Sequence, residues 1–423
     1  MAITVQHNET ARILTLNNGL TICLERLPYL RSVSAGVWIK TGSANEDERI
    51  TGIAHFLEHL FFKGTATRDT HELMEAIEGK GGQFNAFTSK EYTCLYVKVL
   101  DEHAQTAIEI LADVLKNSVF NDFEKERNVI LEEIASIEDT PDDYAHDLLG
   151  LHLWPDHPLG RPISGTQASV GGLTIDDIRA YYKQWYVPEN IVVSIAGNFD
   201  EEVVLAQLQA EFEGLERGAI PPRCLAPVFN SGLKLVDSKI SQSHMCFAFP
   251  GVTVDADERY AFEVLSSTLG GGSTSRLFER IREDEGLAYN IYSYQSSYLT
   301  AGMFGIYAAI APQNLDRTIE LTCAELRRMR EEIVDADELQ SNKEQIKGNL
   351  LMALENTFTR MSRMAKSMMY YGRLVPIDEI IARIEAVTAE DVQETATRIY
   401  QPDTTSLLVY GPAEGQSEKW IAL

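Results

Sequence analysis

Paired cysteines, long apolar runs and an excess of basic charge are missing from this sequence. Its five cysteines are odd in number, widely spread and never form a Cys-x-x-Cys pair, which disfavours a disulfide framework and a thiolate zinc site and fits a reducing compartment. No apolar run reaches the roughly 18 residues of a transmembrane helix. The N-terminal residues do not combine a basic start with an apolar stretch. We therefore expect a cytoplasmic protein without a signal peptide, transit peptide or membrane-spanning segment.

Acidic residues outnumber basic ones. The chain has 63 Asp and Glu against 37 Lys and Arg, which gives a formal net charge of −26. Such a charge disfavours nucleic acid and anionic membrane surfaces as partners and favours cationic ones, basic peptides among them. A solvated acidic surface kept for solubility explains the same charge equally simply.

The chain repeats one plan twice. Residues 216–230 contain a Pro-Pro pair without helical or alternating periodicity, and they divide the 423 residues almost equally. Residues 174–200 and 388–414 each read as an acid-started helix, then Tyr-x-Pro, then an apolar strand ending in glycine. We predict an α+β fold of two tandem homologous domains, 1–215 and 231–423, each a mostly antiparallel sheet packed with helices.

The strongest motif is His55-Phe-Leu-Glu58-His59. On a helix, histidines at i and i+4 lie on one face one turn apart, close enough to share a cation. Zinc accepts imidazole and carboxylate ligands, and His-x-x-Glu-His is the inverzincin pattern. Burying these side chains without a metal or partners would be costly. We interpret His55 and His59 as zinc ligands and Glu58 as the general base on a zinc-bound water.

The repeat isolates this motif. When the two halves are aligned, its three polar residues fall opposite Phe262, Leu265 and Ser266. This alignment predicts that the fold itself does not need polar side chains at these positions. It therefore favours a chemical role for the motif in the first domain.

A third ligand is expected, with the fourth position left open for water. Residues 123–139 read as a helix on which Glu126 and Glu133 are seven apart and share a face. Glu133 would coordinate the metal, and Glu126 would orient a ligand histidine or the helix. Spacing alone leaves Glu126 and Glu132 open as alternatives, because a charged helix face is usually solvated. The buried side of this helix would come from three apolar residues: Val129, Ile130 and Ile134.

These motifs resemble the pitrilysin family of zinc peptidases, in the mitochondrial-processing-peptidase branch and its bacterial relatives. The strings GIAHFLEHLFFKGT and GGQFNAFTSKEYT also match, and the resemblance covers essentially the whole chain with its duplicated plan. It implies a zinc metalloendopeptidase with one Zn2+ per subunit that hydrolyses peptides or unfolded polypeptides. It also implies Glu133 as third ligand, Glu126 behind the ligands and Glu58 as base.

A substrate strand follows from the same resemblance. Asn85, Ala86, Phe87 and Thr88 match the family's exposed edge strand, which pairs with the substrate backbone. Backbone hydrogen bonds of this kind give affinity with little demand on the substrate sequence. From the residues alone, a plain core strand is the simpler interpretation.

Arg282 and Tyr289, seven residues apart, match a pair that binds substrate and stabilises the tetrahedral intermediate in complete family members. From the residues alone, they read as an arginine on a solvated face and a core tyrosine. In long family members the pair and the zinc lie in different domains opposite each other. In a two-domain chain, the resemblance implies a homodimer with composite sites, zinc from one subunit and Arg282 with Tyr289 from the other.

Two other functions remain open. The chain also resembles the non-catalytic core subunits of the respiratory bc1 complex, which share this fold but typically have degraded metal residues. An enzyme that depends on a different, inactive partner chain is the other possibility. The complete metal motif speaks against the scaffold, and the intact Arg282–Tyr289 pair speaks against dependence on such a partner.

Overall fold

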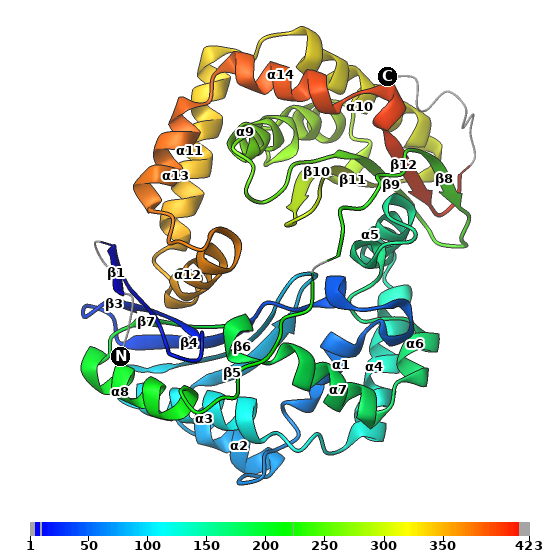
Figure 1. The fold of residues 1–423 in the computed structure, drawn as a ribbon. Coiled ribbons are helices and arrows are strands. Elements are labelled where there is room, and N and C mark those ends of the chain that lie inside the picture. The colour runs from blue at the N-terminus through cyan, green and yellow to red at the C-terminus, as the bar shows by residue number, and fades with distance from the viewer. Residues whose placement is uncertain (1–4, 9–10, 223, 414–423) are drawn as a thin grey trace. The chain divides into compact units, whose positions relative to one another are not determined.

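The computed structural model describes residues 5–8, 11–222 and 224–413 (Figure 1). They form two compact units, each of which takes one segment from the other half of the chain. Unit 1 consists of Met1–Ala135, Pro162–Cys224 and Met352–Val375. Unit 2 consists of Ser136–Arg161, Leu225–Leu351 and Pro376–Leu423. The boundary after Cys224 lies inside the predicted linker, but the two exchanged segments distinguish these units from the contiguous domains expected from the sequence.

Unit 1 contains a seven-stranded sheet in the order β1-β2-β3-β7-β4-β6-β5. All neighbouring strands are antiparallel except β3 and β7. Strand β7 is buried at every position, which explains why its sequence is apolar apart from Ser194. The strands are β1 (Val5–Asn8), β2 (Ala11–Thr15), β3 (Thr21–Arg26), β4 (Ser32–Ile39), β5 (Gln83–Thr88), β6 (Thr93–Leu100) and β7 (Ile191–Gly197).

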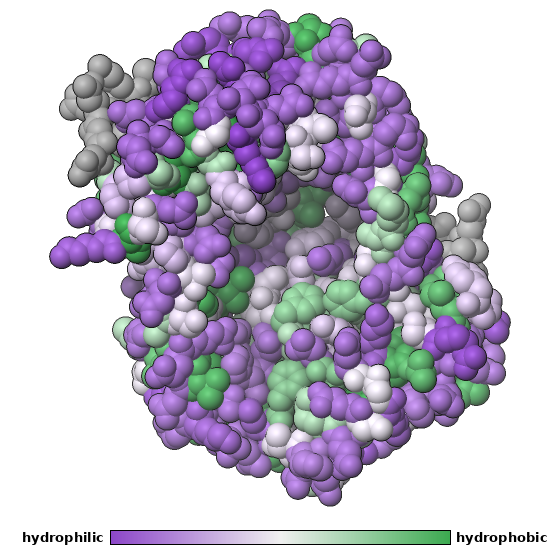
Figure 2. All heavy atoms as spheres, turned by 180° about the vertical axis from the view of Figure 1, so that it is seen from behind, coloured by the Kyte–Doolittle hydropathy of each residue, from purple (hydrophilic) through white to green (hydrophobic). Residues whose placement is uncertain are grey.

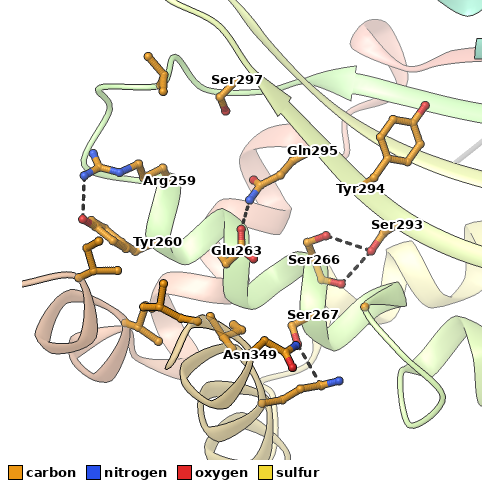
Figure 3. A pocket seen from close by; sticks show the side chains of 17 residues that line it. Arg259, Tyr260, Glu263, Ser266, Ser267, Ser293, Tyr294, Gln295, Ser297 and Asn349 are labelled. Carbon is orange, nitrogen blue, oxygen red and sulfur yellow. Dashed lines mark hydrogen bonds between the residues drawn. The ribbon is translucent and has the colours of Figure 1, made fainter. Parts of the chain in front are cut away.

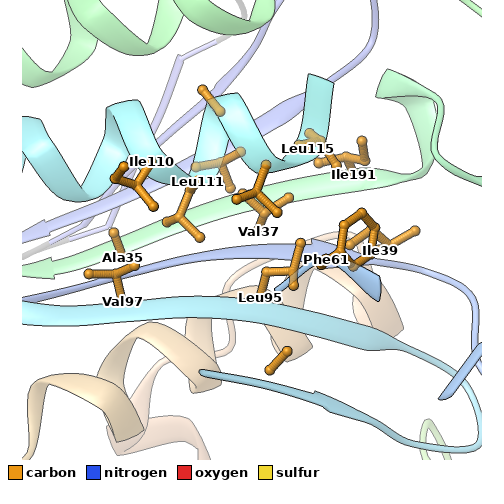
Figure 4. Packing of buried hydrophobic residues seen from close by; sticks show 14 of the residues in the cluster. Ala35, Val37, Ile39, Phe61, Leu95, Val97, Ile110, Leu111, Leu115 and Ile191 are labelled. Carbon is orange, nitrogen blue, oxygen red and sulfur yellow. The ribbon is translucent and has the colours of Figure 1, made fainter. Parts of the chain in front are cut away.

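Helices cover both faces of this sheet. On one face, Val37 of β4 and Val97 of β6 pack beneath Leu111 of α3 (Figure 4). On the other face, α12 packs against β4 and β7, and Ser194 Oγ donates to the carbonyl of Met361 at 2.8 Å. The α-helices of unit 1 are α1 (Ile53–Leu60), α2 (Thr70–Glu78), α3 (Ala104–Asn117), α4 (Phe123–Glu138), α6 (Gln167–Gly172), α7 (Ile175–Trp185), α8 (Glu201–Phe212) and α12 (Thr357–Tyr371). Its short 3-10 helices are η1 (Ser43–Asn45), η2 (Glu48–Ile50), η3 (Asp101–His103) and η5 (Pro188–Asn190).

Unit 2 contains a five-stranded sheet in the order β10-β11-β9-β12-β8, with β12 and β8 parallel and the other pairs antiparallel. This is the order and direction of β5-β6-β4-β7-β3 in unit 1. The predicted fold of two homologous α+β domains with mostly antiparallel sheets is therefore confirmed. The strands are β8 (Gly232–Val236), β9 (Ser243–Pro250), β10 (Ala288–Ser297), β11 (Gly302–Ile310) and β12 (Ser406–Tyr410).

The helices of unit 2 enclose a second apolar core, to which β9, β11, α9, α10 and α14 contribute. They are α5 (Pro141–Leu153), α9 (Arg259–Gly270), α10 (Leu315–Glu331), α11 (Ala336–Ala353), α13 (Ile377–Ala386) and α14 (Ala389–Ile399), with the π-helical turn η6 (Phe278–Asp284) and the 3-10 turns η4 (Pro158–Gly160), η7 (Pro312–Asn314) and η8 (Pro402–Thr404). Within the described residues, no helix combines the length and apolar character needed to cross a membrane.

Hydrophilic residues cover most of the face seen in Figure 2, with hydrophobic residues in scattered groups.

The repeated sequence pattern has a local cause. Thr174 caps α7 with Asp177 in a reciprocal capping box, and Thr388 caps α14 with Asp391 in the same way. Each helix is followed by a Tyr-x-Pro turn, η5 or η8, and then by the buried strand β7 or β12. The periodicity change predicted from the sequence is therefore the change from a capped helix to a central strand.

Candidate metal centre

Helix α1 presents the inverzincin motif on one face. Its apolar residues Ile53, Phe56, Leu57 and Leu60 are fully buried in the core of unit 1. The three motif residues lie on the remaining face and are partly accessible. The helical period therefore separates a packing face from a polar face within eight residues.

The start of α1 is fixed by Glu46, which the sequence analysis missed. Its buried carboxylate accepts hydrogen bonds from the backbone amides of Gly52 at 2.8 Å and Ala54 at 2.9 Å. Gly52 has φ +93°, and a Cβ there would lie 2.7 Å from the carbonyl oxygen of Ser164, so only glycine fits this turn. No spacing rule identifies Glu46, because its role depends on a loop that returns to the helix N-terminus.

Two helices bring the three expected ligands together. His55 Nε2 lies 3.5 Å from Glu133 Oε1, and His59 Nε2 lies 3.4 Å from Glu133 Oε2. One ligand atom from each of the three residues lies within 4.8 Å of the others. Glu133 comes from α4, 74 residues beyond His59 in the chain, so tertiary packing assembles the cluster.

This donor set fits zinc. Bonds of about 2.05 Å at tetrahedral angles place neighbouring donor atoms about 3.3 Å apart, close to the two nitrogen–oxygen separations found here. Two imidazoles and one carboxylate form a known catalytic zinc ligand set that leaves a fourth position open. The residues present therefore suit a zinc ion bound by His55, His59 and Glu133.

Glu126 lies behind the ligands rather than among them. Its side chain is 4% exposed, with Oε2 3.3 Å from His59 Nδ1 and Oε1 2.8 Å from Lys63 Nζ. This contact orients the ring so that His59 Nε2 faces Glu133. On the same helix, Glu132 is exposed, so the alternative that it coordinates the metal has no geometric support.

The prediction for the buried side of α4 is partly wrong. Ile130 and Ile134 are buried, as expected, but Val129 is 45% exposed. The three residues cannot share one inward face, because Val129 is rotated by about 100° from its neighbour Ile130. The apolar stripe of α4 is therefore narrower than the sequence run indicated.

The pKa shifts of His55 and Glu133, unlike that of His59, favour metal binding at neutral pH. Burial lowers the pKa of His55 to about 4, against the opposing effect of Glu133, so this imidazole is neutral and has a free lone pair. Burial also disfavours the charged form of His59, but Glu133 and Glu126 outweigh it and raise the pKa of His59. The hydrogen bond from His59 lowers the pKa of Glu133, which keeps that carboxylate anionic.

Glu58 is held beside the cluster by the edge strand. Thr88 Oγ1 donates to Glu58 Oε2 at 2.6 Å. Burial raises the pKa of Glu58, while the Thr88 hydrogen bond lowers it in part. A desolvated carboxylate with a raised pKa is a better proton acceptor than a solvated one, as a general base requires.

Strand β5 contains the four residues expected to bind substrate. It is an edge strand of the unit 1 sheet, paired on one side with β6. Asn85 is exposed, Ala86 is buried, and Phe87 and Thr88 are partly buried. The backbone groups of β5 that face away from β6 can therefore pair with an extended peptide.

Arg282 and Tyr289 lie together in unit 2. The Arg282 guanidinium donates to the carbonyl of Tyr289 at 2.8 Å and lies over the rings of Tyr289 and Phe278, at 4.8 and 4.6 Å from their centroids. Tyr289 is 81% exposed, so the prediction of a core tyrosine made from the residues alone is wrong. Arg282 belongs to the π-helical turn η6, a conformation that is rare and frequent at functional sites.

The candidate metal centre of unit 1 has a structural counterpart in unit 2. Ser266 of α9 hydrogen-bonds with Ser293 of edge strand β10 at 3.1 Å, as Glu58 of α1 does with Thr88 of β5. Ser267 donates to Asn342 of α11 at 2.7 Å. This matches the contact between His59 and Glu126 of α4.

The register predicted for the repeat is therefore wrong by one residue. Phe262 and Leu265 are buried in the core, so they correspond to apolar positions of α1. The polar motif residues instead correspond to Glu263, Ser266 and Ser267. Both units keep polar side chains on this face, but among the described residues only unit 1 brings together a set of candidate metal ligands there. The predicted register placed the buried residues Phe56 and Leu60 opposite the polar Glu263 and Ser267. A shift of one residue, which turns a helix by about 100°, removes this mismatch.

A histidine pair one turn apart, with an intervening glutamate and a carboxylate from a second helix, defines the inverzincin class of metallopeptidases. Comparison with known families agrees with this class. Residues 21–167 match the description "Insulinase (Peptidase family M16)", and residues 172–346 match "Peptidase M16 inactive domain". The chain belongs to peptidase family M16, the pitrilysin family.

Relatives extend over nearly the whole chain. The uncharacterized zinc protease YmxG of Bacillus subtilis is 42% identical over 93% of this chain and 97% of its own length. An uncharacterized zinc protease of Streptomyces coelicolor is 40% identical over 95% of this chain and 90% of its own length. The fold is similar to that of a protease from Helicobacter pylori, with a TM-score of 0.89 at 21% identity, covering 95% of this chain and 99% of that one. It is also similar to a chain of Complex III from Candida albicans, with a TM-score of 0.86 at 19% identity, covering 97% and 98%.

Proposed function

We propose that this protein is a zinc metalloendopeptidase that hydrolyses peptides or unfolded polypeptides, with one Zn2+ per subunit. The observation that carries the proposal is the convergence of His55, His59 and Glu133 within 4.8 Å, with Glu58 held next to them by Thr88. This arrangement provides both a set of zinc ligands and a general base, which zinc-dependent hydrolysis requires.

Zinc, when bound, supplies Lewis-acid polarisation of the scissile carbonyl and of water. Glu58 accepts a proton from the attacking water and delivers it to the leaving amine. Its partial burial makes the carboxylate basic, and Thr88 holds one oxygen so that the other can turn to the water. Glu126 keeps the His59 ring in its binding orientation.

Strand β5 supports a preference for extended substrates. Pairing of a peptide with the open edge of β5 aligns its backbone beside Glu58, because Thr88 and Glu58 are in direct contact. This mode reads the backbone rather than the side chains. We therefore infer that unfolded segments, which have unpaired backbone groups, are the substrates.

The test compares variants that separate metal binding from catalysis. Glu58→Gln should retain zinc and lose at least ~100-fold in peptide hydrolysis, whereas His59→Ala should lose both. His71→Ala, at a histidine whose side chain is 83% exposed, is the matched control and should retain both. Zinc is measured by elemental mass spectrometry and activity on a peptide library with and without chelator. Full activity in Glu58→Gln would remove Glu58 as the base.

We further propose a homodimer with composite sites, in which Arg282 and Tyr289 of one subunit serve the metal centre of the other. Their contact and the exposure of Tyr289 support a pair that is available to substrate. A mixture of Glu58→Gln and Tyr289→Phe subunits should recover activity above either variant alone, because one site in the mixed dimer is complete. In the control mixture, the Tyr289→Phe subunit is replaced by the Glu58→Gln/Tyr289→Phe double variant. This mixture should show no recovery, because neither subunit then supplies Glu58. Absence of recovery in the first mixture would contradict the composite site.

A non-catalytic scaffold is the competing function, since the match over residues 172–346 is to an inactive domain and a Complex III chain has a similar fold. The complete ligand set in unit 1 favours the enzyme. Pure protein without zinc and without chelator-sensitive hydrolysis would favour the scaffold. We also propose a cytoplasmic location, supported by five widely spread cysteines that never form a Cys-x-x-Cys pair; cell fractionation tests it.

A further inference from the structure

Unit 2 contains a pocket at the position that corresponds to the metal centre of unit 1. Its volume is about 710 Å³, and it lies between α9, β10, α11 and α13 (Figure 3). This volume is in the range of small-ligand sites. Polar groups from α9, β10 and α11 line one side, while Ile346, Ile380 and Ile384 contribute apolar surface.

Glu263 is the acidic residue of this pocket. It points from α9 toward β10, where the amide nitrogen of Gln295 donates to its carboxylate (Figure 3). Among the described residues, no lysine, arginine or histidine forms an ion pair with Glu263. Its surroundings in the pocket raise its pKa by desolvation, which the Gln295 hydrogen bond offsets in part, but the side chain remains accessible. An accessible carboxylate without an ion-pair partner can bind a ligand cation.

Gln295 holds this carboxylate in place. Its Nε2 donates to Glu263, while its Oε1 is buried and has no hydrogen-bond partner among the described residues. Because the amide oxygen is buried, it is not accessible from the pocket. Glu263 is therefore the acceptor that this wall presents to a ligand.

The basic residue of the pocket is directed elsewhere. Arg259 donates to the carbonyl of Ala256 at 2.9 Å and to the hydroxyl of Tyr260 at 2.7 Å, and it lies over the Tyr260 ring. Figure 3 shows its guanidinium turned toward Tyr260 and away from Glu263. The position next to Glu263 is therefore left for a cation that the protein does not supply.

We propose that this pocket is a binding site for an alkylammonium or guanidinium group, such as the side chain of lysine or arginine. Glu263 accepts the charged donors, Gln295 holds the Glu263 carboxylate by its amide N–H, and the isoleucines cover the aliphatic stem. The net charge of −26 attracts such cations over a longer range. This pocket occupies the same place in the fold of unit 2 as the candidate metal centre does in unit 1. Its chemistry differs, because Glu263 occupies the position that corresponds to His55.

The test is a titration of the full-length protein, isotope-labelled at isoleucine methyl groups, in the presence of a chelator. The probe is N-acetyl-lysine N-methylamide, and its matched control is the norleucine analogue, which has the same stem without the charge. We expect methyl signals of Ile346, Ile380 and Ile384 to shift, and the lysine probe to bind at least ~10-fold more tightly, or about 1.4 kcal/mol. Equal affinity for the two probes would overturn the proposal.

Variants assign the effect to Glu263. Glu263→Gln should reduce affinity for the lysine probe to that of the norleucine probe, while Glu263→Asp, which keeps the charge, should retain a preference. Glu394→Gln, at an exposed glutamate of the same unit, is the control and should bind like the unaltered protein. Unchanged binding by a folded Glu263→Gln protein would also overturn the proposal.

Two further probes distinguish the source of the cation. If 1,5-diaminopentane binds as tightly as the lysine probe, the site serves free amines. If a capped lysine-containing peptide binds more tightly than both, the site serves polypeptide side chains. Either outcome supports cation recognition by Glu263, and failure of both to bind contradicts it. These measurements need no catalysis, so they are independent of the proposed peptidase function.

Discussion

The hydroxyl of Thr88 donates to the carboxylate of Glu58 over 2.6 Å, and this bond links edge strand β5 to helix α1. The strand expected to hold substrate and the residue expected to act as base are therefore in direct contact. We expect Thr88→Val to lower kcat by about 10-fold, because a hydrogen bond to a charged group contributes about 1.5–3 kcal/mol. Thr106→Val, at a partly buried threonine on α3, is the control and should leave kcat unchanged.

The same substitution should change the pH dependence of hydrolysis. The Thr88 hydrogen bond lowers the pKa of Glu58 against the larger effect of burial, so its loss raises that pKa. A general base works when deprotonated, and the acid limb of the kcat–pH profile should therefore move to higher pH in Thr88→Val. A profile that moves to lower pH, or does not move, would contradict the role of Thr88.

Glu126 should affect the metal through His59. We expect Glu126→Gln to weaken zinc affinity by about 10- to 100-fold, as for other carboxylates that orient a ligand histidine. Competition with a chromophoric chelator measures this affinity. Glu124 lies two residues before Glu126 on α4, and its side chain is 77% exposed. The Glu124→Gln variant should therefore bind zinc normally. Equal affinities in the two variants would show that Glu126 does not orient the ligand.

Glu46 should stabilise the metal-binding helix. Its carboxylate accepts two amide hydrogen bonds at the start of α1, and Glu46→Gln leaves one acceptor oxygen for both. We expect a loss of about 1–2 kcal/mol in the free energy of unfolding, measured by urea denaturation of the metal-free protein. Glu48→Gln, at an exposed position, should have no measurable effect; a similar loss there would point to general charge effects.

The exchanged helix α12 should depend on a buried ion pair. Arg360 of α12 lies 2.8 Å from Glu25 of β3, whose side chain is 1% exposed. Arg360→Met should cost about 3–5 kcal/mol of unfolding free energy, because it leaves a buried carboxylate. Adding Glu25→Leu should restore much of this loss in a double-mutant cycle. Arg383→Met, from an exposed pair with Asp257, should cost less than about 1 kcal/mol.

Local sequence patterns predicted the helices and strands of the repeat. The Thr-capped helices α7 and α14, the Tyr-x-Pro turns and the strands that follow depend on interactions between near neighbours in the chain, which a sequence shows directly. The inverzincin motif is equally local, because one turn of α1 places His55 and His59 on one face. The family resemblance then indicated Glu133, which spacing alone did not separate from Glu126 and Glu132.

Other features depend on contacts between distant segments. Glu46 caps α1 from a returning loop, Arg360 reaches Glu25 across 335 residues, and the two units exchange α5 and α12. The one-residue error in the repeat became apparent only from such contacts, namely the burial of Phe262 and Leu265 and the hydrogen bonds of Ser266 and Ser267. Periodicity predicts which face of a helix is apolar. It does not identify the residues of other segments that contact the polar face.

The sequence by itself therefore determined the class of fold and its duplication and predicted three residues of the candidate metal centre, since these follow from helical and strand periods and from the chemistry of adjacent side chains. Tertiary structure decided which carboxylate of α4 faces the histidines, which residue holds Glu58, and what replaces the metal centre in unit 2. These are matters of distance between segments that are far apart in the chain. Only packing of the folded chain sets such distances, because the side chains that meet there carry no local signal of their partners.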